Sequence, residues 1–149
     1  RRCGGRGGSS GNGMEINQIT SIIIEESIAI HRDLGPGLME SVYEVILSER
    51  LRDRGLKVEC QVEVPLIYQG RRFPLGFRLD MLVEARVVVE LKSVELLPPV
   101  AFKKLTTYLR LTDREVGLLI NFGEVILKNG LHRIVNNYKG PMPGRTDRS

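Results

Sequence analysis

The order of the predicted elements indicates an α/β (α+β) protein in which a mixed β-sheet is flanked by helices. Three observations predict this class. Two segments with apolar residues at helical spacing come first, three strand-like segments follow, and a further helix separates these from a continuously apolar strand. With a last short strand the order becomes α-α-β-β-β-α-β-β, which is typical of a sheet covered by helices.

Two helices are predicted before the strands. Apolar residues recur every three to four positions over residues 16–31, and Gly35-Pro36 ends this helix. The same spacing returns over residues 38–54, and Gly55 stands where a helix commonly ends in a left-handed residue.

Three strands follow the second helix. Apolar and polar residues alternate over residues 57–64, as in a strand with one buried face. Gln69-Gly70 marks a turn, and residues 73–83 and 86–92 are predicted as the next two strands.

The last part of the chain contains a helix and two strands by the same criteria. Residues 100–111 follow two prolines and are predicted as the third helix, and residues 116–122 are apolar throughout, as in a strand buried on both faces. Asn129-Gly130 lies between the apolar pairs at 126–127 and 134–135 and predicts a β-hairpin.

Length and composition indicate one ordinary domain. The chain has 149 residues, of which 42% are hydrophobic and 27% charged. Two cysteines predict neither a cysteine-based zinc site nor a disulfide framework. Because no apolar run approaches the roughly 20 residues that cross a bilayer, and no secretory signal is evident, we expect a soluble, cytoplasmic protein without a membrane partner. The oligomeric state stays open.

The net charge of +4 is concentrated at the two ends of the chain. Residues 1–13 hold three arginines and no acid, and residues 139–149 hold three basic residues and one acid. Residues 14–138 therefore carry a net charge of −1, so the overall charge is weak evidence for nucleic-acid binding. Both ends are rich in glycine or proline, and we expect two disordered tails around a single domain at 14–138.

Asp80, Glu90 and Lys92 form the sharpest candidate site. Glu90 and Lys92 lie two positions apart in a strand and therefore point to one face, within an otherwise apolar run. If Asp80 faces them, two carboxylates and an ammonium meet, and a hard cation such as Mg²⁺ would relieve the repulsion between the carboxylates. The competing interpretation is an ordinary Glu–Lys pair on a solvated strand face.

This site sets a requirement on the strand register. Pairing Asp80 with Glu90 in an antiparallel hairpin fixes the sum of the partner numbers at 170. The turn must then hold an odd number of residues, such as Glu84-Ala85-Arg86, unless a bulge supplies the offset.

Glu40, at the start of the second helix, is a further candidate. It shares a helix face with Tyr43 and Glu44 and follows the rigid turn at 35–37. We expect its carboxylate to point at the carboxylate pair, and the alternative is that it only complements the dipole of its own helix.

These segments together resemble a known family. GPGLMESVY, the YQG turn, the strand with Asp80, VVVELKS, Tyr108-Leu109 and GLLINFG occur in this order and are similar to the GxxExxY proteins of the PD-(D/E)XK nuclease superfamily. The resemblance covers about residues 19–136. It implies a restriction-endonuclease-like α-β-β-β-α-β core.

Carried over by position, the resemblance implies four catalytic residues: Glu40, Asp80, Glu90 and Lys92. Glu40, Asp80 and Glu90 would hold Mg²⁺ or Mn²⁺, and Lys92 would be the lysine of the motif.

The chain departs from the family pattern at three motif positions. Leu79 replaces the usual proline before Asp80, and in the third helix Ala101 and Lys104 stand where a histidine and a glutamine are usual. The resemblance places Lys104 and Tyr108 at the nucleic-acid substrate.

Two functions of different classes remain open at this point. The first is a metal-dependent nuclease that hydrolyses phosphodiester bonds of nucleic acid, which the Asp80/Glu90/Lys92 set favours. The second is a catalytically inactive module of the same fold that binds nucleic acid or protein, which Lys104 and the near-neutral domain favour. The sequence does not distinguish DNA from RNA.

Overall fold

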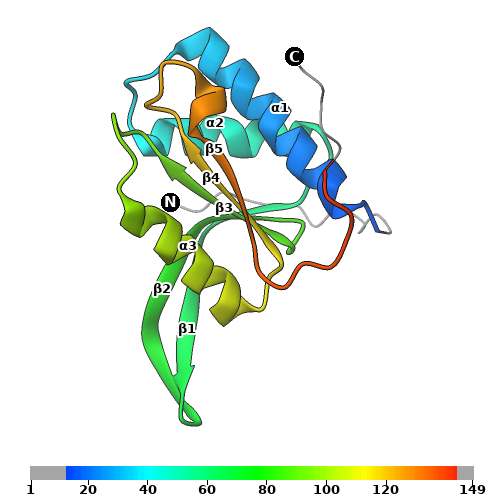
Figure 1. Ribbon diagram of the computed structural model, residues 1–149, viewed down its shortest axis with the longest axis vertical. Helices are drawn as coiled ribbons and strands as arrows, with labels where there is room; N and C mark the ends of the chain where they lie inside the picture. The colour runs from blue at the N-terminus through cyan, green and yellow to red at the C-terminus, as the bar shows by residue number, and fades with distance from the viewer. Residues whose placement is uncertain (1–12, 144–149) are drawn as a thin grey trace.

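A single mixed sheet of five strands organises the molecule, whose computed structural model describes residues 13–143 (Figure 1). Residues 1–12 and 144–149, which hold most of the two predicted tails, lie outside the described part. In chain order the elements are α1 (Ile16–Leu34), α2 (Glu40–Asp53), β1 (Val58–Tyr68), β2 (Arg71–Val83), β3 (Val87–Lys92), α3 (Pro99–Thr112), β4 (Val116–Asn121), the short 3₁₀ helix η1 (Leu127–Gly130) and β5 (Leu131–Val135).

The strands lie side by side in the order β1-β2-β3-β4-β5. Neighbouring strands are antiparallel except β3 and β4, which are parallel. A parallel pair needs a crossover connection, and α3 supplies it. The predicted class, a mixed sheet flanked by helices, is confirmed.

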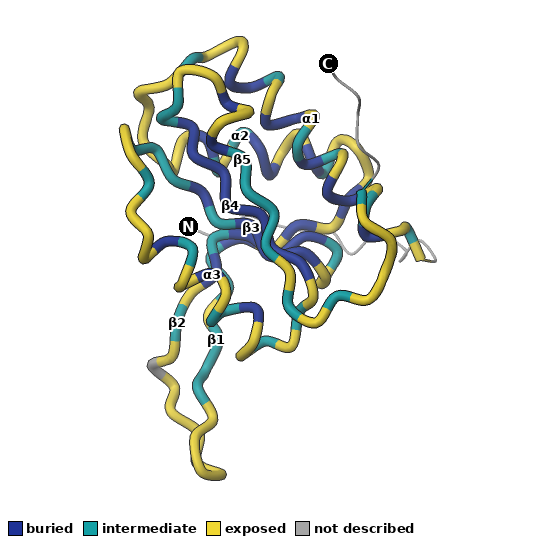
Figure 2. The backbone as a smooth tube through the Cα atoms, viewed as in Figure 1, coloured by how far each residue is buried: buried dark blue, intermediate teal, exposed yellow. Residues whose placement is uncertain are grey.

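Helices cover both faces of this sheet. Helices α1 and α2 pack on one face, where Tyr43 of α2 stacks on Phe122 with 4.2 Å between the ring centroids. Helix α3 packs on the other face, with Leu105 and Leu109 against Val88 and Leu119 of the sheet. The buried residues accordingly concentrate in β3, β4 and the helix faces turned toward them (Figure 2). No helix in residues 13–143 is long and apolar enough to cross a membrane.

The turn between α1 and α2 is fixed by a tyrosine of the second helix. Gly35 and Gly37 have φ of 72° and 107°, a region that glycine adopts without strain. The hydroxyl of Tyr43 donates to the Gly35 carbonyl at 2.5 Å and accepts from the Leu38 amide at 3.2 Å. The Gly-Pro-Gly sequence and Tyr43 therefore set where α2 begins.

The hairpin predicted at Asn129-Gly130 is wrong. These residues end η1, and the only strand beside them is β5, which pairs antiparallel with β4. Gly130 is buried, and a Cβ there would lie 2.6 Å from the Asn121 carbonyl oxygen. A close approach to β4, and not a two-residue turn, explains the glycine.

The segment after β5 returns to the first helix. The carbonyl of Pro141 accepts hydrogen bonds from the Asn17 side chain at 3.0 Å and from the Tyr138 hydroxyl at 2.8 Å. Ordered contacts thus continue to Pro141, within the range 139–149 predicted as a tail.

Strands β1 and β2 extend beyond the body of the molecule as a free hairpin arm (Figure 1). We call residues 64–77 the arm. At its base the register shifts between the pairs Val64↔Phe77 and Leu66↔Phe73, so three residues of β2 oppose one of β1. Gly76 allows this bulge, because a Cβ there would lie 2.1 Å from the Val64 carbonyl oxygen.

Candidate active site

The candidate site lies where β2 and β3 separate. Their paired residues are Met81↔Val89, Leu82↔Val88 and Val83↔Val87, and each pair sums to 170 as predicted. The predicted three-residue turn at 84–86 joins them, with Glu84 and Ala85 both at φ 54°. Beyond Met81 and Val89 no backbone pair joins β2 to β3, and the next two residues are Asp80 and Glu90.

Asp80 and Glu90 replace the missing backbone acceptors with their side chains. The Asp80 amide donates to the Glu90 carboxylate at 3.1 Å, and the Leu91 amide donates to the Asp80 carboxylate at 2.9 Å. Each carboxylate thus accepts a hydrogen bond from a backbone amide of the facing strand. The carboxylates therefore lie together at the end of the β2–β3 ladder, as the register prediction required.

The pKa of Glu90 lies well above that of an ordinary carboxylate. Burial, followed by the negative charge of Asp80, raises the pKa of Glu90 from its ordinary 4.5 to about 8. Glu90 therefore keeps its proton to a higher pH than an exposed carboxylate does, chiefly because it is buried and secondly because Asp80 is negatively charged. A cation bound between Asp80 and Glu90 would be stabilised by both carboxylates.

Lys92 contributes positive charge beside this pair. It lies two residues after Glu90 at the end of β3, half-buried and in register with Asn121 of β4. Its charge lowers the pKa of Glu90, against the larger effect of burial. Within the described residues Lys92 forms no ion pair at 4.0 Å or less, which leaves its ammonium available to an incoming anion.

Glu40 lies beside the segment that follows Lys92. Its carboxylate is exposed and accepts a hydrogen bond from the Ser93 amide at 3.3 Å, and the Ser93 hydroxyl donates to the Leu38 carbonyl at 2.6 Å. Glu40 thus contacts more than its own helix. In residues 13–143 no three acidic, histidine or cysteine side chains form a metal-binding group, so Glu40 does not join Asp80 and Glu90 directly.

Glu44 lies one turn further along α2, and the charge of Asp80 is one of the causes that raise its pKa. It is half-buried, and burial followed by the charge of Asp80 raises its pKa, while a 2.6 Å hydrogen bond from the Gln61 side chain opposes the rise. Gln61 has φ of 52° and sits between the residues that pair with Leu79 and Met81, opposite Asp80. Helical spacing places Glu44 on the same face as Glu40 but does not predict that Glu44 interacts with Asp80.

Helix α3 supplies one residue to the site and presents another to solvent. Tyr108 stacks on Phe77 of β2 with 4.5 Å between the ring centroids. Burial and then the charges of Glu90 and Asp80 raise the pKa of Tyr108. Lys104 is exposed one turn earlier, and the buried Ala101 packs into the core under α3.

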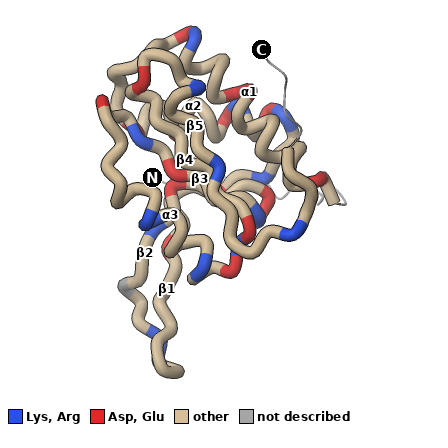
Figure 3. Tube along the Cα trace, viewed as in Figure 1, with Lys and Arg blue, Asp and Glu red and all other residues tan. Residues whose placement is uncertain are grey.

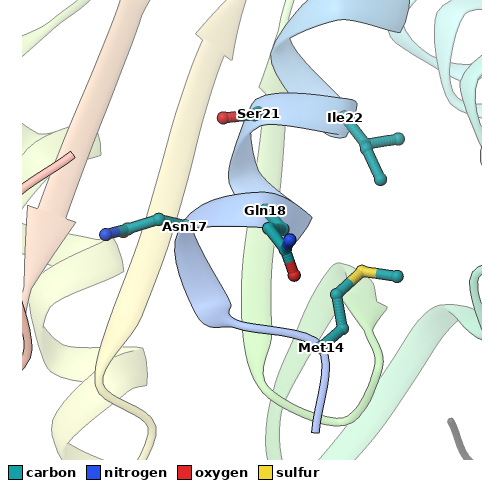
Figure 4. Close-up of a pocket in the computed structure, with 5 residues that line it drawn as sticks. All are labelled: Met14, Asn17, Gln18, Ser21 and Ile22. Carbon is teal, nitrogen blue, oxygen red and sulfur yellow. The ribbon is translucent and has the colours of Figure 1, made fainter. Parts of the chain in front are cut away.

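A cavity of about 420 Å³ lies elsewhere, at the start of α1 (Figure 4). It is lined by Met14, Asn17, Gln18, Ser21 and Ile22, none of which is charged or belongs to the candidate site. It offers no carboxylate for a cation and no cation for a phosphate.

The geometry agrees with a comparison of sequences. The sequence model of the PD-(D/E)XK nuclease superfamily matches residues 17–134. This match spans most of the chain, and the protein belongs to that superfamily. No curated protein and no solved structure matches the chain.

Proposed function

We propose that this protein hydrolyses phosphodiester bonds of nucleic acid with Mg²⁺ or Mn²⁺, as a member of the GxxExxY branch of its superfamily and in the cytoplasm. The observation that carries the proposal is the geometry of Asp80 and Glu90, whose carboxylates accept amide hydrogen bonds across the end of the β2–β3 ladder, with Lys92 two residues after Glu90. An isolated strand-face Glu–Lys pair would be solvated, whereas Glu90 is partly buried, accepts the Asp80 amide and has a raised pKa.

The donor set at Asp80 and Glu90 fits a hard divalent cation. Carboxylate oxygens are its preferred ligands, and Mg²⁺ commonly takes one or two protein carboxylates and keeps several waters. A cation bound there would also lower the pKa of Glu90, which burial and then the charge of Asp80 raise. Superfamily membership supports the same choice, because these nucleases generally use divalent metals.

Each residue has a distinct role in this proposal. When bound, the cation supplies Lewis acidity to a phosphate oxygen and lowers the pKa of a water. Asp80 and Glu90 hold it, and Glu40 adds negative charge through water from the neighbouring helix. Lys92 orients the attacking water or stabilises the charge that develops on the phosphate. Lys104 and Tyr108 of α3 contact the nucleic acid.

Calorimetric titration tests the cation site directly. We expect Mg²⁺ or Mn²⁺ to bind the wild type and to release close to one proton at pH 7, because the ion displaces the proton of Glu90. Titration in two buffers of different ionisation enthalpy measures that proton. Asp80→Ala should abolish binding. Equal binding by Asp80→Ala and the wild type would contradict the site.

Hydrolysis is tested separately with purified protein, Mn²⁺ and a panel of single- and double-stranded DNA and RNA. Cleavage lost in both Asp80→Ala and Glu90→Gln supports the nuclease. Binding of a nucleic acid without cleavage of any would instead identify the inactive module, which the presence of Lys104 and Ala101 at two motif positions favours.

A further inference from the structure

Val64 and Phe77 at the base of the arm pack against the core under α3, but the outer part of the arm has no such contact to explain its surface. This outer part extends away from the body of the molecule (Figure 1), and it exposes large apolar side chains to solvent. Ile67 is 62% exposed and Tyr68 61% exposed, while Phe73 is 40% exposed. Side chains of this size are seldom left together in water without a partner.

All charged residues of the arm are basic. Residues 64–79 contain three arginines and no acidic residue, although the domain at 14–138 has a net charge of −1. Arg78 is paired with Glu63 at 3.3 Å, near the base of the arm. Arg71 and Arg72, at the end, form no ion pair with any described residue. In Figure 3 the outer arm accordingly carries basic and no acidic segments.

The side chains at the end of the arm suit a nucleic-acid groove. The Arg71 guanidinium lies 5.8 Å from the centre of the Phe73 ring, so an arginine and an aromatic ring are presented together. A two-stranded ribbon fits a groove of a double helix, and arginines combined with apolar side chains are the usual groove contacts of such ribbons.

The arm also holds these groups at a defined distance from the candidate site. Arg72 pairs with Ile67 of β1, six residues along that strand from Gln61, which lies opposite Asp80. At about 3.3 Å per residue the separation is roughly 20 Å, or about six base pairs of a duplex at 3.4 Å each.

We propose that the arm is a docking element for double-stranded nucleic acid, with Arg71 and Arg72 on the backbone and groove about six base pairs from the phosphate held at Asp80 and Glu90. This inference deepens the proposed function and rests on it for the position of the reacting phosphate. The arm itself can be tested without hydrolysis.

The test measures binding of a labelled 30-base-pair duplex by fluorescence anisotropy in EDTA over a range of salt concentrations. The double variant Arg71→Ala/Arg72→Ala should bind at least tenfold more weakly and should lose about two phosphate contacts from the salt dependence. Arg71→Lys/Arg72→Lys should keep the salt dependence. Thermal melting checks that each variant is folded.

A matched control removes the same charge at the opposite end of the molecule. Arg32 is exposed in the last turn of α1, and Lys128 is exposed in η1, which contacts α1. The end of α1 lies at the opposite end of the molecule from the arm (Figure 1). Arg32→Ala/Lys128→Ala should bind the duplex within about twofold of the wild type. An equal loss in this control would show that only net charge matters and would overturn the docking element.

Three further outcomes would overturn the inference. They are no duplex binding by the wild type, unchanged duplex binding by Arg71→Ala/Arg72→Ala, and a loss confined to single strands of the same sequence. Hydrolysis of a small phosphodiester by the wild type with Mn²⁺ needs no arm, so failure of the proposed nuclease is recognised separately from failure of the docking element.

Discussion

The side chain of Asn121 forms hydrogen bonds to both backbone polar groups of Val94. Its Oδ1 accepts from the Val94 amide at 3.0 Å, and its Nδ2 donates to the Val94 carbonyl at 2.9 Å. The same Oδ1 accepts from the Gly123 amide at 3.0 Å. Asn121 is fully buried at the end of β4 and fixes the chain directly after Lys92 and Ser93. It therefore positions the backbone that Glu40 contacts.

We expect Asn121→Ala to destabilise the fold. The substitution leaves partly buried backbone groups of Val94 and Gly123 without partners, which costs about 2–4 kcal/mol of unfolding free energy. Urea denaturation measures the loss. Asn129→Ala, on the exposed part of η1, is the matched control and should change stability by less than about 0.5 kcal/mol. Equal effects of the two substitutions would contradict the role of Asn121.

Glu90 should make stability depend on pH. Its pKa is raised from 4.5 to about 8 in the folded protein, so between these values the folded state keeps a proton that the unfolded chain releases. Stability from this group is full below pH 4.5 and falls as the pH rises through 8. Glu90→Gln removes the titration, and its melting temperature should rise relative to the wild type between pH 5 and pH 9. Melting curves at several pH values test this.

The control for that measurement is Glu59→Gln, which changes an exposed carboxylate of β1. It removes the same charge without touching Asp80 or Glu90, so the rise expected for Glu90→Gln between pH 5 and pH 9 should be absent. If the curves of Glu90→Gln and the wild type stay parallel, Glu90 titrates as an ordinary carboxylate and the raised pKa is wrong.

Lys92 should matter for turnover more than for binding. It stands beside the carboxylate pair without an ion-pair partner among the described residues, so its charge is available to the reacting phosphate. Lys92→Ala should lower cleavage by about 10²–10³-fold, as for loss of one preorganised stabilising charge. Cation affinity, measured by calorimetry, should be nearly unchanged. A parallel loss of cation affinity would assign Lys92 to the cation site instead.

Lys104 should matter for binding alone. It is exposed on α3, one turn from the Tyr108 ring beside the carboxylates. Lys104→Ala should weaken nucleic-acid binding modestly and remove about one phosphate contact from its salt dependence. Its cleavage rate at saturating substrate should match the wild type. A large fall in that rate would place Lys104 in the reaction.

The regular elements and the strand register could be predicted because each depends on local pattern. The helical spacing before Gly35 and the alternation after Lys57 both record which face is buried. The sum of 170 followed from one assumption about Asp80 and Glu90 together with the alternation of strand faces.

The remaining features depend on contacts between distant segments. Glu44 gains its raised pKa from burial and from Asp80, and Gln61 reaches it from another strand, so helical spacing alone could not separate Glu44 from Glu40. The buried Gly130 allows a close approach to Asn121, nine residues earlier in the chain. The Asn129-Gly130 dipeptide is the same as in a two-residue hairpin turn, so the sequence does not distinguish the two cases. The sequence does not predict that the arm extends beyond the body (Figure 1), and therefore does not predict that Arg71 and Arg72 lack ion-pair partners among the described residues.

The replacement of backbone acceptors by Asp80 and Glu90 has a consequence for evolution in this superfamily. Valine at both positions would leave the two strands free to continue pairing past Met81 and Val89, which satisfies the same amides and removes a buried, repelling pair. Loss of the proposed hydrolysis would then accompany a gain in stability, reached in two substitutions. Descendants that only bind should carry a longer β2–β3 ladder in place of the carboxylates.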